Sequence, residues 1–211
     1  MSELVAWLGR LEENSNEGEI VMKSTRILLA LGPMMAATPA LAHVGEHYHW
    51  SFAAGFTHPF GGVDHVLAML SVGVLAALLG GRAIWFVPAT FAAMMLVGGG
   101  LGMAGVVVPA FEIGIVASMI VLGALVTWGK PLAPFATMAL VGFFAVFHGY
   151  AHGVERTVED SGLGYSAGFA LASFSLHGLG ILAGAGMIKN ERATRVSGIA
   201  VTLVGVWVAF S

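Results

Sequence analysis

The sequence contains no cysteine and carries little charge. The missing cysteines exclude disulfides, thiolate metal sites and a cysteine nucleophile, so any metal ligand must be a nitrogen or oxygen atom. Charged residues make up 10% of the 211 residues, whereas soluble domains usually carry about 25%. The net charge of −3 and the absence of a basic run argue against a nucleic-acid partner.

Two catalytic signatures are also missing from the sequence. There is no His-Glu-x-x-His pair, which is typical of zinc hydrolases, and no Walker motif for ATP. We therefore expect neither an enzyme nor an ATP-driven pump.

What the chain does have is long apolar runs. Hydrophobic residues make up 57% of it and 30 residues are glycine, which is common in membrane helices. A bilayer is crossed by about 20 residues of helix, and six segments have roughly that length: 60–79, 83–102, 111–128, 131–149, 165–188 and 196–210. We expect an all-α, polytopic protein in a lipid bilayer, built as a six-helix transmembrane bundle. Gly98 with Gly102, and Gly180 with Gly184, predict close helix contacts.

The amino-terminal region has the pattern of a cleavable signal peptide over residues 22–42. A basic start at Lys23 and Arg26 precedes an apolar run and the sequence Ala40-Leu41-Ala42. The mature chain then begins at His43, with a periplasmic segment over 43–59 and a permease domain over 60–211. Residues 1–21 are interpreted as a mis-called start or a disordered extension. The alternative is a cytoplasmic tail followed by an uncleaved first helix.

The basic residues give an independent indication of orientation. With His43 outside, the inner loops contain five of them and the outer loops only Arg156; the five are Arg82, Lys130, Lys189, Arg192 and Arg195. Cytoplasmic loops are enriched in Lys and Arg. The pattern therefore predicts a bacterial inner-membrane protein with its mature amino terminus in the periplasm.

On this topology the histidines gather towards the outer side. Three lie in the tail, two near the start of the first span, two near the end of the fourth and one inside the fifth: His43, His47, His49, His58, His65, His148, His152 and His177. No inner loop contains a histidine. The outer half of the bundle is therefore the candidate metal site.

The segment 58–65 is the first candidate motif. On a continuous helix, His58 and His65 are nearly two turns apart and share a face, with Asp64 beside it. Gly61 and Gly62 would permit either a close backbone approach or a locally opened helix. An acidic group at membrane depth needs a cation or a partner. The alternative is a structural Asp–His hydrogen bond near the interface.

The segment 147–155 is the second candidate motif. His148 and His152 are four residues apart and Glu155 follows three later, so all three share a face if the helix continues. Two imidazoles one turn apart can chelate a divalent metal. Alternatively, each histidine bonds backbone, and Glu155 pairs with Arg156 in solvent.

Two isolated histidines complete the candidate set. His177 lies in an apolar helix, where ionisable groups are functional candidates, although it could simply bond a neighbouring helix. His43 could chelate a metal through its imidazole and the free amine that cleavage exposes. The alternative there is a flexible polar tail.

Ligand chemistry limits the cargo but does not select it. Imidazole suits Zn, Cu, Fe and Ni, whereas carboxylate and water suit Mg and Ca, and a mixed His/Asp/Glu set without thiolate disfavours Cu(I). These ligands alone do not select nickel over cobalt or zinc. A rival interpretation is an electron-transfer protein with two b-type haems, which requires histidine pairs near both membrane faces. A purified protein without a Soret band would exclude it.

Both motifs resemble signatures of the HupE/UreJ family, nickel permeases associated with hydrogenase and urease. The first similarity is His58-Pro59, Gly62, Asp64-His65 and Leu67-Ala68-Met69; the second is Phe147-His148-Gly149, Ala151-His152-Gly153 and Glu155. The resemblance extends over residues 22–211. It implies that His58, Asp64, His65, His148, His152 and Glu155 take part in nickel uptake.

These observations lead to one expectation of function. We expect a secondary permease that imports Ni²⁺, or Co²⁺, from periplasm to cytoplasm, with no permanently bound cofactor, and that supplies hydrogenase or urease. Because imidazole ligands must be neutral, uptake should fall as the pH drops through the histidine range. The sequence leaves the oligomeric state open.

Overall fold

The structure is a computed structural model that describes residues 52–130, 132–155 and 163–210. The predicted signal peptide, residues 1–21 and the tail histidines His43, His47 and His49 lie outside this part of the chain. Its elements are all helical: α2 (Phe52–Thr57), the short 3-10 helix η1 (His58–Phe60), α3 (Val63–Leu79), α4 (Ala83–Met103), α5 (Phe111–Trp128), α6 (Pro134–Glu155), α7 (Leu163–Met187) and α8 (Glu191–Phe210).

The long helices confirm the predicted all-α membrane fold. Five of them, α4 to α8, are long and apolar enough to cross a membrane, and the bent pair α2–η1 and α3 raises the number to six if it forms one span. Two boundaries differ by five residues or more from those expected. Helix α6 runs beyond Gly149 to Glu155, and α8 begins at Glu191, five residues before Val196.

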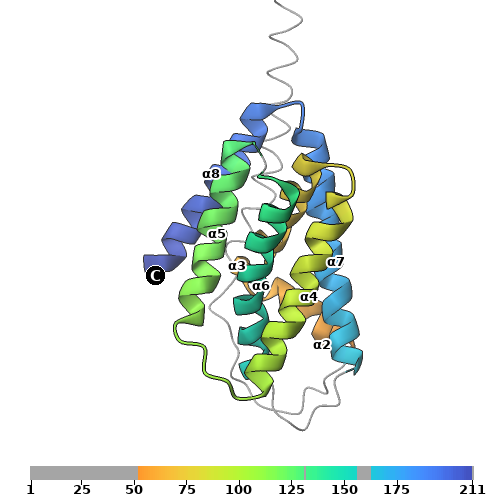
Figure 1. Cartoon of the computed structure of the whole chain (residues 1–211), viewed down its shortest axis with the longest axis vertical. Helices are drawn as coiled ribbons and strands as arrows, with labels where there is room; N and C mark the ends of the chain where they lie inside the picture. Colours follow the sequence, from red (N-terminus) through yellow and green to blue (C-terminus); the bar gives the residue numbers. More distant parts are fainter. Residues whose placement is uncertain (1–51, 131, 156–162, 211) are drawn as a thin grey trace, which may run out of the picture. The chain divides into compact units, whose positions relative to one another are not determined.

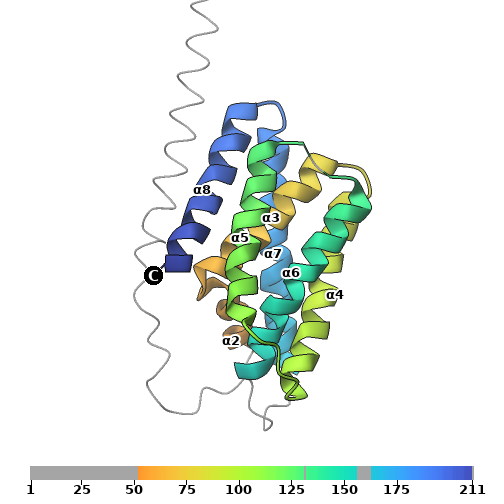
Figure 2. The ribbon, with the colours of Figure 1, turned by 60° about the vertical axis from the view of Figure 1, so that its left-hand side comes forward.

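The long helices pack as side-by-side pairs of neighbours, which Figures 1 and 2 show from two directions. Helix α4 lies along α6, α3 along α7 and α5 along α8, while the short α2 packs on α7. The connections α3–α4, α5–α6 and α7–α8 lie at one end of this helix group, and the α4–α5 connection lies at the opposite end (Figure 1). Consequently the described basic residues share one end, because they lie in the first three connections and at the start of α8.

Glycine permits the helices of each pair to approach closely. A Cβ on Gly98 of α4 would overlap the Val146 carbonyl oxygen of α6, and one on Gly180 of α7 would overlap the Leu70 carbonyl oxygen of α3. Gly102 and Gly184 also face neighbouring backbone. The close contacts predicted for both glycine pairs are therefore confirmed, and they are the small-residue packing that membrane helices favour.

A sharp bend separates the two histidines of the first motif. The segment 52–60 and helix α3 meet at 83°, with Gly61 and Gly62 between them. The prediction that His58 and His65 share the face of one continuous helix is therefore wrong. The alternative of a locally opened helix is correct, and Pro59 occupies the first turn of η1, where its missing N–H costs nothing.

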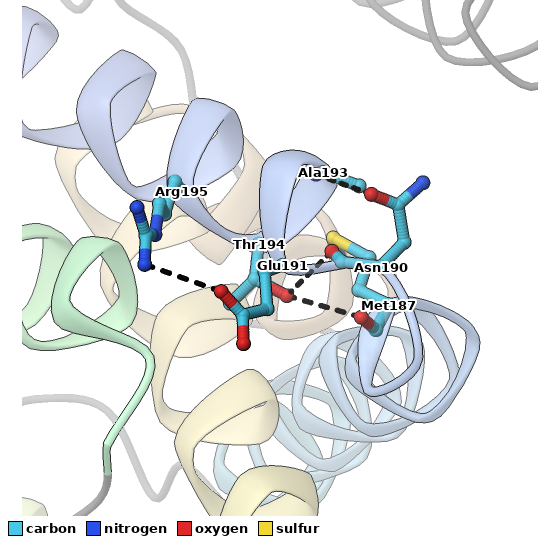
Figure 3. Close-up of polar contacts among 6 residues, drawn as sticks. All are labelled: Met187, Asn190, Glu191, Ala193, Thr194 and Arg195. Carbon is cyan, nitrogen blue, oxygen red and sulfur yellow. Dashed lines mark hydrogen bonds and ion pairs between the residues drawn. The ribbon is translucent and has the colours of Figure 1, made fainter. Parts of the chain in front are cut away.

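A side-chain cap starts the last helix, as Figure 3 shows. The Asn190 Oδ1 accepts a hydrogen bond from the Ala193 backbone N–H at 3.1 Å, and the Thr194 hydroxyl donates to the Met187 carbonyl oxygen at 3.1 Å. Glu191 and Arg195 form an exposed ion pair of 3.2 Å one turn apart, which contributes little.

Removing this cap should measurably destabilise the protein. We expect Asn190→Ala to reduce the free energy of unfolding by about 1 kcal/mol, because an amide at the helix start loses its acceptor. Asn190→Asp keeps an acceptor and should match the wild type. Thermal unfolding in detergent would measure the difference, and equal melting of all three proteins would contradict the assigned cap.

Candidate metal site

Four histidines from three segments meet at one end of the helix group. His58 comes from η1, His65 from the first turn of α3, and His148 and His152 from the last two turns of α6. The His65 ring centroid lies 4.7 Å from that of His148 and 4.5 Å from that of His152. The His58 ring lies 4.7 Å from His152, and its Nε2 is 3.0 Å from the His152 Nδ1. We call these four residues the histidine cluster.

Helix α6 brings the two motifs together. Because it remains helical through Glu155, His148 and His152 lie one turn apart on the same face, as predicted. His152 then lies between His58 and His65 and bridges the two sides of the bend. The two histidines of the first motif therefore meet through the second motif and not through a common helix face.

Several imidazole nitrogens in this region have no hydrogen-bond partner. In the described part of the chain, the buried side-chain nitrogen and oxygen atoms without a partner all belong to histidines: His65 Nε2, His148 Nδ1, His152 Nε2 and both ring nitrogens of His177. Burying a polar atom without a partner is unfavourable. The cluster therefore contains unused lone-pair or N–H positions, which is a feature of a binding site more than of a packed core.

Asp64 supplies the negative charge next to the cluster. Its Oδ2 lies 3.4 Å from the His65 Nδ1, and its side chain is partly exposed. The Asp–His contact predicted as an alternative to metal binding is thus present. It does not exclude a ligand role for His65, because histidines that bind metals commonly direct the second ring nitrogen towards a carboxylate.

Aromatic side chains enclose the cluster, and the sequence alone did not single them out. The Phe169 ring of α7 lies 4.7 Å from His152, and the Tyr165 ring lies 5.7 Å from His58. On the inner side the fully buried Phe91 of α4 lies 5.9 Å from His148. These rings limit the access of water to the histidines.

His177 lies apart from the other four. Its ring contacts Phe91 at 5.2 Å and Phe174 at 6.3 Å, and it is almost completely buried in α7. Phe91 therefore contacts both His148 and His177. The sequence predicted a deeper position for His177, and the structure adds that an aromatic ring adjoins both imidazoles.

The described residues do not form a ready-made metal site. No group of three or more His, Asp or Glu side chains within them already has the spacing to hold an ion. The His58–His152 hydrogen bond engages His58 Nε2 and His152 Nδ1, so these two nitrogens are not open to an ion. Glu155 ends α6, but its side chain is outside the described set, as is all of His43, so two predicted ligands stay predictions.

Comparisons with known proteins cover most of the chain. The family described as HupE / UreJ protein matches residues 29–208. Protein HupE of Rhizobium leguminosarum bv. viciae is 39% identical over 188 residues, which is 87% of this chain and 97% of that protein. No solved structure matches the chain. Together with the two motifs and the helical fold around them, these matches show that the chain belongs to the HupE/UreJ family.

Proposed function

We propose that this protein is a secondary permease that imports Ni²⁺, with Co²⁺ as the next candidate, from the periplasm to the cytoplasm. Membership in the HupE/UreJ family supports a role in nickel or cobalt transport that serves hydrogenase or urease. The observation that carries the proposal is the histidine cluster, in which three buried imidazole nitrogens have no partner. Imidazole is a good ligand for both ions.

The incomplete geometry of the cluster suits transport better than permanent binding. An ion would gain His65 Nε2, His148 Nδ1 and His152 Nε2 directly, but the His58–His152 hydrogen bond must open before His58 Nε2 can bind it. This rearrangement lowers the net affinity. A transport site must release its ion, so moderate affinity is an advantage.

The charge distribution supports a periplasmic position of the cluster. The cluster lies at the end of the helix group opposite the connections that contain the basic residues. If the basic end faces the cytoplasm, as basic loops usually do, the cluster faces the periplasm. It would then be an entrance, where Asp64 attracts the cation and the histidines replace part of its water.

The rival haem interpretation lacks support in the described residues. Two b-type haems across the membrane need histidine pairs near both faces. The described histidines gather at one end, with His177 in the middle of α7 and none in the connections at the basic end.

Uptake of radioactive nickel by cells that express the chain tests the proposal. We expect accumulation above that of cells with an empty vector, suppression by excess unlabelled Ni²⁺, partial suppression by Co²⁺ and a weaker effect of Zn²⁺. The reason is that membership in the family supports nickel and cobalt as the transported ions, whereas the ligand set alone would also admit zinc. Accumulation equal to the empty-vector cells would contradict the proposal.

A further inference from the structure

Ser118 of α5 is a polar side chain that contacts the histidine cluster from outside the two motifs. It is fully buried, two turns into the helix. Its Oγ lies 2.8 Å from the His148 Nε2 and 2.6 Å from the carbonyl oxygen of Ile115. Both distances are normal for hydrogen bonds to a hydroxyl.

The proton count decides the direction of these two bonds. A serine hydroxyl has one hydrogen to donate, and a carbonyl oxygen can only accept. If Oγ bonds both neighbours, its hydrogen points to Ile115, and Oγ accepts a hydrogen from the His148 Nε2. Neutral His148 then has its proton on Nε2 and a lone pair on Nδ1.

The burial of His148 favours the same tautomer. Its side chain is fully buried, and its Nδ1 has no hydrogen-bond partner. With the proton on Nδ1, a buried N–H donor would be left without an acceptor, which is unfavourable. With the proton on Nε2, the atom without a partner is a lone pair, which is what a cation requires.

We propose that Ser118 is a positioning residue that holds His148 as the Nε2–H tautomer and so presents its Nδ1 to the transported cation. The proposal rests on the proposed function for the identity of the cation, whereas the tautomer does not depend on it. Histidines that bind metals commonly donate their second ring N–H to an oxygen acceptor, and this partner fixes the ring and its tautomer. Here the acceptor comes from a third long helix, so α5 orients a ligand of α6.

Nitrogen NMR of the metal-free full chain tests the tautomer directly. In protein with ¹⁵N-labelled histidine, His148 signals are assigned by their loss in His148→Gln. We expect the wild type to show a protonated Nε2 and an unprotonated Nδ1, and Ser118→Ala to show a mixture. A wild-type His148 protonated on Nδ1 would overturn the proposal, whatever Ser118→Ala shows.

Nickel uptake kinetics then test the consequence. Loss of an outer-shell partner typically weakens metal affinity or activity about 10- to 100-fold, so Ser118→Ala should raise KM for Ni²⁺ within that range. Ser118→Thr keeps the hydroxyl and should restore most of the affinity. The matched control is Ser173→Ala, which removes a buried serine that bonds the Phe169 carbonyl within its own helix.

The two measurements separate the two proposals. A wild-type KM in folded Ser118→Ala would overturn the positioning role and leave nickel transport intact. A wild type that fails to transport nickel would contradict the proposed function, while the metal-free NMR would still decide whether Ser118 sets the tautomer.

Discussion

Cells that express His65→Ala or His148→Ala are expected to accumulate at least about tenfold less nickel than cells with the wild type, since even outer-shell changes at metal sites cost 10- to 100-fold. Each substitution removes an imidazole that is buried in the cluster and has one nitrogen without a partner. The two rings lie 4.7 Å apart on different helices, so removing either ring would leave the other without a co-ligand. Radioactive nickel uptake at low concentration is the measurement.

The control must remove a ring without touching the cluster. Phe143→Ala is suitable, because this aromatic residue is on the same helix as His148 but is 57% exposed on the outer face of the helix group. We expect near-normal uptake from it at equal expression. If His65→Ala and His148→Ala cells accumulate nickel like the wild type, the histidine cluster is not the transport site.

Adding a single methyl group at Gly98 is expected to disrupt folding. Its Cβ would overlap the Val146 carbonyl oxygen, and the Tyr150 backbone nitrogen would be within 2.9 Å. Backbone cannot move aside as a flexible side chain does, so α4 and α6 must separate. Overpacking of this kind typically costs about 1–3 kcal/mol. Since α6 holds His148 and His152, the damage should also reach the cluster.

Gly100→Ala is the matched control on the same helix. Nothing lies within 4 Å of a Cβ at Gly100, and Ala is about 1 kcal/mol more favourable than Gly inside a helix. Melting in detergent should therefore give a lower midpoint for Gly98→Ala and an unchanged or higher one for Gly100→Ala. Equal midpoints would show that α4 and α6 are not in close backbone contact at Gly98.

Much of the architecture was predictable because membrane helices satisfy all their backbone hydrogen bonds internally. Long apolar runs therefore translate almost directly into helices, and the predicted segments 83–102 and 111–128 match α4 and α5 to within one residue. The i, i+4 spacing of His148 and His152 likewise needed only helical periodicity. The glycine contacts also followed from local pattern, since small residues at membrane depth mark close approach.

The candidate site was only partly predictable. The residues of both motifs were named from their chemistry, but their mutual geometry depends on the 83° bend after η1, which Gly61 and Gly62 permit without requiring. Ser118 and Phe91 were missed, since a serine or a phenylalanine in an apolar helix looks like ordinary packing. The sequence feature that could have identified Ser118 is weak. Ser118 is a hydroxyl residue two turns into a span, and the start of that span lies near the histidines.

The sequence by itself determined that this is a helical membrane protein whose candidate ligands are nitrogen and oxygen atoms, and it predicted that the histidines gather towards one side. Those properties follow from composition and from local spacing along single helices. Only the tertiary structure decided that His152 bridges His58 and His65, that Phe91 adjoins both His148 and His177, and that Ser118 contacts His148. The reason is that these contacts join helices far apart in the chain, where spacing carries no information and packing alone sets the distance.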